Sequence, residues 1–173
     1  DAQAVARMIR FFRGHYGRLA FDTDRRHWKK SFPEAVGSYQ KALDGYGDQQ
    51  DFWESAAVDG FTGVWERATS LYGFGRLSAF SYAEYLWILG VPFHCDRLFL
   101  GDREGSRSHR NGLCIVGGRD DLVWHADNPA FDGHYPPEVV AGLAELGREL
   151  LGEAQDRAAG TSWAGTVDYF TLE

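Results

Sequence analysis

Apolar side chains recur at helical spacing in one segment after another, and the strand-like alternation of apolar and polar residues is nearly absent. In residues 2–13, for example, Val5, Met8, Ile9 and Phe12 fall on one helical face. Similar spacing predicts further helices over residues 34–44, 51–55, 63–71, 76–89 and 137–157, with glycine or proline at most boundaries. The pattern predicts an all-α protein, a single-domain helical bundle spanning residues 1–173.

The composition fits one domain with a core, since 44% of the 173 residues are hydrophobic. No run approaches the roughly 18 consecutive apolar residues of a membrane helix, and the N-terminal residues lack the pattern of a signal peptide. Cys95 and Cys114 are too few for a disulfide framework, so we expect two reduced thiols in a cytoplasmic protein with no membrane partner. Because residue 1 is Asp and not Met, we also expect part of the protein to lie outside residues 1–173.

The net charge of −7 hides an asymmetry along the chain. Residues 1–119 contain 16 Lys and Arg against 14 Asp and Glu, whereas residues 120–173 contain 2 against 11. A locally basic face binds DNA even on an acidic protein, because phosphate neutralisation is a local effect. The candidate DNA contacts in the most basic segment are Arg25, Arg26, Lys29 and Lys30. The alternative is that the basic residues only keep the surface soluble.

The most specific local pattern is Leu-Tyr-Gly-Phe-Gly-Arg-Leu-Ser-Ala at residues 71–79, between two expected helices. Two glycines around an apolar residue allow a tight turn, whose amide N–H groups suit an anion. The pattern resembles the hairpin of helix-hairpin-helix DNA-binding domains, here near residues 67–89. Its candidate DNA contacts are Gly73, Phe74, Gly75, Arg76 and Ser78. The alternatives are a glycine-rich turn without a ligand, and a divalent or monovalent cation held by carbonyls of the turn.

Asp96 follows this hairpin at a spacing that suits a catalytic aspartate. In helix-hairpin-helix DNA glycosylases, the helix after the hairpin ends at a Gly-x-Pro turn with a catalytic Asp a few residues beyond, and Gly-Val-Pro occupies residues 90–92 here. Apolar neighbours predict a raised pKa for the Asp96 carboxyl, which suits a base or an electrostatic stabiliser. The alternative is a helix N-cap. Leu77 stands where bifunctional glycosylases carry a lysine, which argues against Schiff-base chemistry.

Residues 101–112 form a polar, arginine-rich stretch that predicts a loop, anchored by the apolar run 113–116. Guanidiniums, hydroxyls, an imidazole and an amide in this stretch offer many donors to a phosphoryl or pyrophosphoryl group. The phosphate-binding candidates are Ser106, Arg107, Ser108, Arg110 and Asn111, and His109 is a second catalytic candidate beside Asp96. The alternative is an exposed loop with no ligand.

Three segments together are similar to the phage amino acid:DNA transferases, also described as α-glutamyl/putrescinyl-thymine pyrophosphorylase-like proteins. They are Gly-Phe-Gly-Arg-Leu-Ser-Ala-Phe at 73–80, Ser-Arg-Ser-His-Arg-Asn-Gly-Leu-Cys at 106–114 with Gly-Arg-Asp-Asp-Leu at 118–122, and Thr-Asp-Arg-Arg-His-Trp-Lys-Lys-Ser-Phe at 23–32. The resemblance extends over roughly residues 20–173 and implies a helical bundle of the helix-hairpin-helix DNA glycosylase type. It implies an enzyme that acts on phosphorylated 5-hydroxymethyluracil in phage DNA. That enzyme replaces phosphate or pyrophosphate with the amine of an amino acid or a polyamine, giving a hypermodified thymine.

This chemistry gives the candidate residues their roles. The target base must leave the stack, and the aromatic candidates that could receive it are Trp28, Trp53, Trp65, Tyr72 and Trp124. Arg107, His109 and Arg110 suit the departing phosphate. Asp96 or a nearby histidine suits the removal of a proton from the donor amine. The candidates for a donor carboxylate are Arg25, Arg26, Lys29 and Arg119. We expect no cofactor and no metal. The alternative is a divalent ion held by His125, Asp127, Asp132 and His134, which cluster within ten residues but match no firm ligand spacing.

Two other functions are compatible with parts of the sequence. A monofunctional DNA glycosylase would use the hairpin and Asp96 but leaves the polar segment 106–111 without a role. A non-enzymatic DNA-binding module would use the hairpin alone. The transferase interpretation uses all three features, so we predict an enzyme of the infected bacterial cytoplasm whose partners are double-stranded phage DNA and a free amino acid or polyamine.

Overall fold

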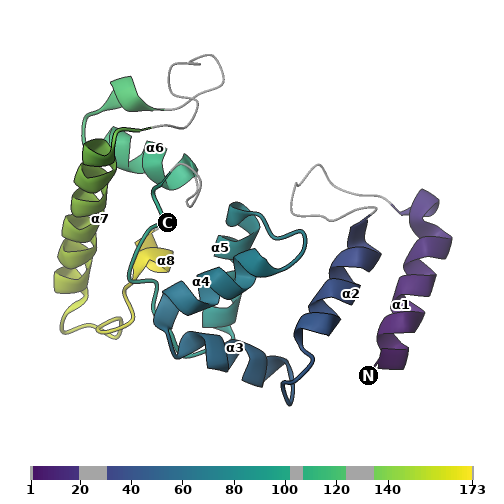
Figure 1. Cartoon of the computed structure of the whole chain (residues 1–173). Coiled ribbons are helices and arrows are strands. Elements are labelled where there is room, and N and C mark those ends of the chain that lie inside the picture. The colour runs from purple at the N-terminus through teal and green to yellow at the C-terminus, as the bar shows by residue number, and fades with distance from the viewer. Residues whose placement is uncertain (1, 20–30, 102–106, 124–134, 173) are drawn as a thin grey trace. The chain divides into compact units, whose positions relative to one another are not determined.

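The computed structural model describes residues 2–19, 31–101, 107–123 and 135–172, and every regular element among them is helical (Figure 1). The α-helices are α1 (Ala2–His15), α2 (Phe32–Ala42), α3 (Gln49–Ala57), α4 (Gly60–Ser70), α5 (Arg76–Ile88), α6 (Arg107–Val116), α7 (Pro137–Ala158) and α8 (Tyr169–Leu172). Two short 3-10 helices are η1 (Tyr16–Arg18) and η3 (Asp120–Leu122). The predicted all-α class is therefore confirmed. None of the described helices is both long and apolar enough to cross a membrane.

The chain divides into two compact units, residues 1–92 and 93–173, and each unit is described by itself. The first contains α1 to α5, and the second contains α6 to α8. The expectation of one domain over residues 1–173 stays a prediction, and so does its helix-hairpin-helix glycosylase type.

Local signals set most helix boundaries. Helix α5 ends just before Gly90, whose φ of +93° is a conformation that glycine adopts without strain. Helix α3 starts earlier than predicted, because the Asp48 side chain caps it by accepting a hydrogen bond from the Asp51 amide at 2.9 Å. Gly60 was expected to separate two helices, but it is the first residue of α4.

The core of the first unit is built around Trp53 on α3, which is 1% exposed. Its indole N–H donates a hydrogen bond to the Tyr39 hydroxyl of α2 at 2.9 Å, and its ring contacts Tyr82 of α5. Phe61 and Val64 bring α4 into the same buried set of side chains. The buried indole has its N–H donor satisfied and contacts side chains of two other helices. Trp53 therefore helps to hold α2, α3 and α5 together.

Gly63 permits the close approach of α4 to α3. A Cβ at this position would overlap the carbonyl oxygen of Ala56 and would also press on Asp59. We expect Gly63→Ala to destabilise the first unit by about 2 kcal/mol, because a backbone carbonyl cannot move aside. Gly37→Ala on α2 is the matched control: nothing lies within 4 Å of the added carbon, and the gain in helix propensity is about 1 kcal/mol. Urea unfolding measures both variants, and equal midpoints would show that the α3–α4 contact is not tight.

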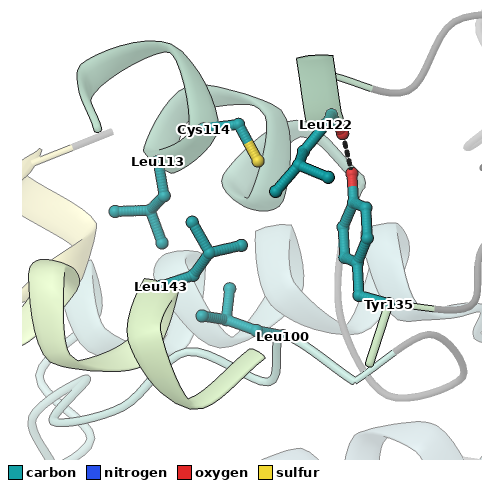
Figure 2. Packing of buried hydrophobic residues seen from close by; sticks show 6 residues of the cluster. All are labelled: Leu100, Leu113, Cys114, Leu122, Tyr135 and Leu143. Atoms are coloured by element: carbon teal, nitrogen blue, oxygen red, sulfur yellow. Dashed lines mark hydrogen bonds between the residues drawn. The ribbon is translucent and has the colours of Figure 1, made fainter. Parts of the chain in front are cut away.

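The second unit has its own core. Its side chains come from the segment before α6, from α6 and η3, and from α7 and the residues just before it. Its buried members are Leu100, Leu113, Cys114, Leu122, Tyr135 and Leu143 (Figure 2). The Tyr135 hydroxyl donates a hydrogen bond to the Leu122 carbonyl, as the dashed line in Figure 2 shows. The predicted thiols are confirmed, since Cys95 and Cys114 are both buried and neither forms a disulfide, and burial raises the pKa of Cys114.

The prediction of a loop over residues 101–112 is wrong for its second half, because α6 begins at Arg107. The polar residues of this segment hid its helical period. Arg110, Leu113 and Cys114 are all buried, at positions three and four apart, and Leu113 packs on α7. The apolar run that was expected only to anchor a loop is the second half of the helix.

Candidate active site

The sequence-predicted hairpin is a tight turn between α4 and α5 in the first unit. Gly73 has φ +83°, and the Phe74 amide donates a hydrogen bond to the Leu71 carbonyl at 3.2 Å. Gly75 starts α5 by accepting a hydrogen bond from the Ala79 amide at 2.8 Å. The Phe74 ring packs edge-on against Tyr82, as expected for an apolar plug. The turn has the predicted form, and its contact with DNA stays a prediction.

Of the candidates for a flipped base, two belong to the core. Trp53 and Trp65 are 1% and 7% exposed, so neither ring has a free face. Tyr72, in the hairpin, is 51% exposed and keeps the predicted role open. Trp28 and Trp124 lie outside the described residues, as do Arg25, Arg26, Lys29 and Lys30.

Asp96 is not in the apolar environment that its neighbours predicted. Its side chain is 67% exposed and lies 3.9 Å from the Arg97 guanidinium. The segment around it, residues 93–100, is irregular, so Asp96 is not a helix N-cap either. The side chains alternate instead: Phe93 and Cys95 point into the core while Asp96 points out. Asp96 is thus a solvent-accessible carboxylate on a segment that is anchored by the buried side chains of Phe93 and Cys95.

A hollow of about 280 Å³ lies along α6, and we call it the α6 hollow. It is lined by Leu98, Ser108, His109, Gly112, Leu113, Val116, Gly147, Leu150, Tyr169 and Leu172. Its wall is mostly apolar, with Ser108 and His109 as polar groups at the helix N-terminus, where the partial positive charge of the helix favours an anion. Two predicted site residues therefore share one hollow.

A second hollow, of about 530 Å³, contains Asp96, and we call it the Asp96 hollow. It is lined by Asp96, Arg97, Leu98, Phe99, Leu100, Gly101, Val140, Ala144, Gly147, Arg148 and Tyr169. Leu98, Gly147 and Tyr169 line both hollows, so the two adjoin each other across these residues. The structure thus brings the two predicted catalytic residues, Asp96 and His109, to neighbouring hollows of one unit.

The other phosphate-binding candidates are distributed around α6. Arg110 is 1% exposed, and its guanidinium carbon lies 5.1 Å from the centre of the Tyr135 ring, outside both hollows. Asn111 is half-buried and lines neither hollow. Ser106 and the side chain of Arg107 lie outside the described residues. These polar side chains do not converge on one site, because successive side chains of a helix point in directions about 100° apart.

Arg119, one of the candidates for a donor carboxylate, is already paired. Its guanidinium donates two hydrogen bonds, of 2.9 and 2.8 Å, to the Asp121 carboxylate. This pair lowers the pKa of Asp121. Among the described residues no three His, Cys, Asp or Glu side chains lie close enough together to hold a metal. His125, Asp127, Asp132 and His134 lie outside those residues.

Sequence reasoning missed Asp168, a buried carboxylate that holds the segment next to Asp96. Its two oxygens accept hydrogen bonds from the Cys95 amide at 2.9 Å and the Phe170 amide at 3.0 Å, and the Tyr169 amide donates to the Cys95 carbonyl at 3.0 Å. These bonds hold the residue before Asp96 against the start of α8. An Asp directly before an apolar Tyr-Phe pair is the cap signal that could have identified it.

Tyr169 and Gly147 were also missed. Burial raises the pKa of the Tyr169 phenol; nearby Cys95 acts in the same direction, Arg148 acts against it, and Asp96 adds to it. The phenol is therefore protonated at neutral pH and available as a hydrogen-bond donor. A Cβ on Gly147 would lie 3.4 Å from the Tyr169 hydroxyl, so glycine at this position of α7 leaves room for the phenol.

Comparison with known proteins supports the predicted family. A family model described as "Amino acid:DNA transferase" matches residues 2–146. The chain is also 33% identical over 128 residues to a protein named serinyltransferase from Salmonella phage ViI, an alignment that covers 70% of this chain and 31% of that protein. The chain therefore spans less than a third of that relative's length. No solved structure matches the chain. Since the family model matches most of its residues, the chain belongs to the amino acid:DNA transferase family.

Proposed function

We propose that this chain transfers the amine of a free amino acid or polyamine onto phosphorylated 5-hydroxymethyluracil in phage DNA, with phosphate or pyrophosphate as the leaving group. The observation that carries the proposal is the pair of adjoining hollows in the second unit, one with Asp96 and one with Ser108 and His109. A carboxylate on one side and an imidazole at a helix N-terminus on the other are what a displacement reaction needs at its two ends.

The reaction balances with these two groups. The Asp96 carboxylate takes a proton from the donor ammonium, and the nitrogen lone pair then forms a bond to the methylene carbon on the base. The carbon–oxygen bond to the phosphate breaks, and its electron pair leaves with the phosphate oxygen. Protonated His109 gives that oxygen a proton, so one proton is transferred overall from the amine to the departing phosphate. Ser108 and the α6 N-terminus stabilise the negative charge of the leaving group.

Three DNA substrates separate this proposal from its alternatives. Duplexes carrying thymine, 5-hydroxymethyluracil or its phosphate ester are incubated with the protein and a pool of amino acids and polyamines, and their nucleosides are analysed by mass spectrometry. We expect a new nucleoside, with the mass of thymidine plus an amine less two hydrogens, from the phosphorylated duplex only. Release of a free base would indicate a glycosylase. Binding with no new nucleoside and no free base would indicate a binding module.

The hairpin glycines provide a test of DNA binding. Gly75 has an ordinary φ of −82°, and nothing lies within 4 Å of an added Cβ. We expect Gly75→Val to leave the first unit folded and to weaken binding of all three duplexes about equally, because a hairpin of this type contacts only the DNA backbone. Gly73→Val is the comparison, since φ +83° makes any side chain there strained by about 1–2 kcal/mol. Fluorescence anisotropy measures affinity, and unchanged affinity for Gly75→Val would make the hairpin a structural turn.

A further inference from the structure

The Asp96 hollow carries charges of both signs around an apolar wall. Its charged lining residues are Asp96 and Arg97 from the segment before α6, and Arg148 from α7. Val140 and Ala144 of the same helix are among its apolar lining residues. An α-amino acid at neutral pH has the complementary pattern, with an ammonium and a carboxylate on one carbon.

We propose that the Asp96 hollow binds a free α-amino acid as its zwitterion, with Arg148 on the carboxylate and Asp96 on the ammonium. The inference rests on the proposed function, because it assigns a place to the amine donor of that reaction. The group that binds the donor carboxylate is then Arg148 of α7, which was not among the candidates from the sequence, Arg25, Arg26, Lys29 and Arg119.

Both charged groups are accessible to a ligand. The Asp96 and Arg148 side chains are 67% and 66% exposed. Arg148 pairs with Glu145 one turn away on the surface of α7, and such exposed pairs contribute only about 0–1 kcal/mol. A ligand carboxylate can therefore replace Glu145 at little energetic cost. Guanidinium and carboxylate also match in geometry, since two parallel hydrogen bonds form between them.

The position of the hollow agrees with the chemistry. An ammonium held by Asp96 lies beside the carboxylate that is proposed to deprotonate it. Tyr169 lines both hollows, so a donor in the Asp96 hollow adjoins the α6 hollow, where the leaving group is proposed to bind. The amine and the carbon that it attacks would thus come from two hollows that share Tyr169 in their linings.

The charge balance selects among amine donors. The described lining carries two guanidiniums, of Arg97 and Arg148, against one carboxylate. A diamine brings two positive charges and no carboxylate. One ammonium can pair with Asp96, but the second has no carboxylate left in the described lining and is repelled by the two guanidiniums. The hollow therefore favours an amino acid over a polyamine.

Equilibrium dialysis without DNA tests this subsite, with radiolabelled L-serine and with ethanolamine, which is serine without its carboxylate. We expect wild-type protein to bind serine about tenfold or more tightly than ethanolamine, and Arg148→Gln to lose most of that difference. Arg157→Gln is the matched control, because Arg157 makes a similar exposed pair with Glu153 on the same helix but does not line the hollow. Arg148→Lys should recover part of the lost affinity, since it restores the charge without the planar fork.

Equal affinity for serine and ethanolamine, equal effects of Arg148→Gln and Arg157→Gln, or no serine binding to wild-type protein would each overturn the subsite. The nucleoside assay keeps this result apart from the proposed function. If Arg148→Gln forms the new nucleoside with an unchanged KM for the amino acid, the subsite is wrong and the transferase stands. If serine binds through Arg148 but no nucleoside forms, the transferase assignment fails and an amino-acid site remains.

Discussion

Asp96→Asn is expected to reduce formation of the modified nucleoside by about a hundredfold to ten-thousandfold, the range typical of losing a general base. The substitution removes the negative charge and the proton acceptor but keeps the size of the side chain. Because the side chain is 67% exposed and its ion pair with Arg97 is long, at 3.9 Å, the fold depends little on it. DNA affinity should therefore stay within about tenfold of wild type.

Glu149→Gln is the control for Asp96→Asn. Glu149 is an exposed acid on α7 that lines neither hollow, and its loss changes the net charge by the same amount. Nucleoside mass spectrometry under single-turnover conditions measures the rate for each variant. Undiminished turnover of Asp96→Asn would remove Asp96 from the mechanism. An equal loss of rate in Glu149→Gln would show that the effect of Asp96→Asn comes from the change in net charge alone.

Asp168→Ala is expected to destabilise the second unit by about 2–4 kcal/mol. The substitution leaves the amides of Cys95 and Phe170 without their acceptor in a buried place, and Asp168 itself is only 2% exposed. Unsatisfied buried donors are costly, because the unfolded chain hydrogen-bonds them to water. The stability of Asp168→Asn should lie between those of the wild type and Asp168→Ala, since an amide oxygen still accepts one of the hydrogen bonds.

Urea unfolding followed by circular dichroism measures this effect, with Asp156→Ala on the exposed surface of α7 as the control. Asp168 is a positioning residue in this scheme, so Asp168→Asn should also lower kcat while leaving the affinity for DNA unchanged. Unfolding midpoints within error of wild type for both Asp168 variants would show that the contact between Cys95 and α8 contributes nothing to the unit.

The helices were predictable where their signals are local. Helix α7 was expected over residues 137–157 and ends at Ala158, because a proline starts it and an apolar stripe runs its length. Helix α6 was missed over its first half. Its start is a run of polar residues, and the reason that Arg110 is buried is a tertiary one, the ring of Tyr135. Pattern reasoning detects apolar stripes but not a stripe that includes a buried arginine.

The site was predictable in part for the same reason. The hairpin and Asp96 follow recognisable local patterns, and Asp96 and His109 do line adjoining hollows. The role of Asp168 depends on the Cys95 amide, 73 residues away in the sequence, and no local pattern reports such a pairing. Likewise, Arg148 is an ordinary exposed arginine on a helix until the fold places it on the Asp96 hollow.

The most direct measurement follows the bridging oxygen of the phosphorylated base. A duplex is prepared with a heavy oxygen isotope between the methylene carbon and phosphorus, and is incubated with the protein and an amino acid carrying a heavy nitrogen isotope. We expect the heavy oxygen to appear in the released phosphate or pyrophosphate, and the heavy nitrogen in the new nucleoside, in equal amounts. Heavy oxygen that stays on the base while unlabelled phosphate is released would contradict displacement at carbon and, with it, the transferase mechanism proposed for Asp96 and His109.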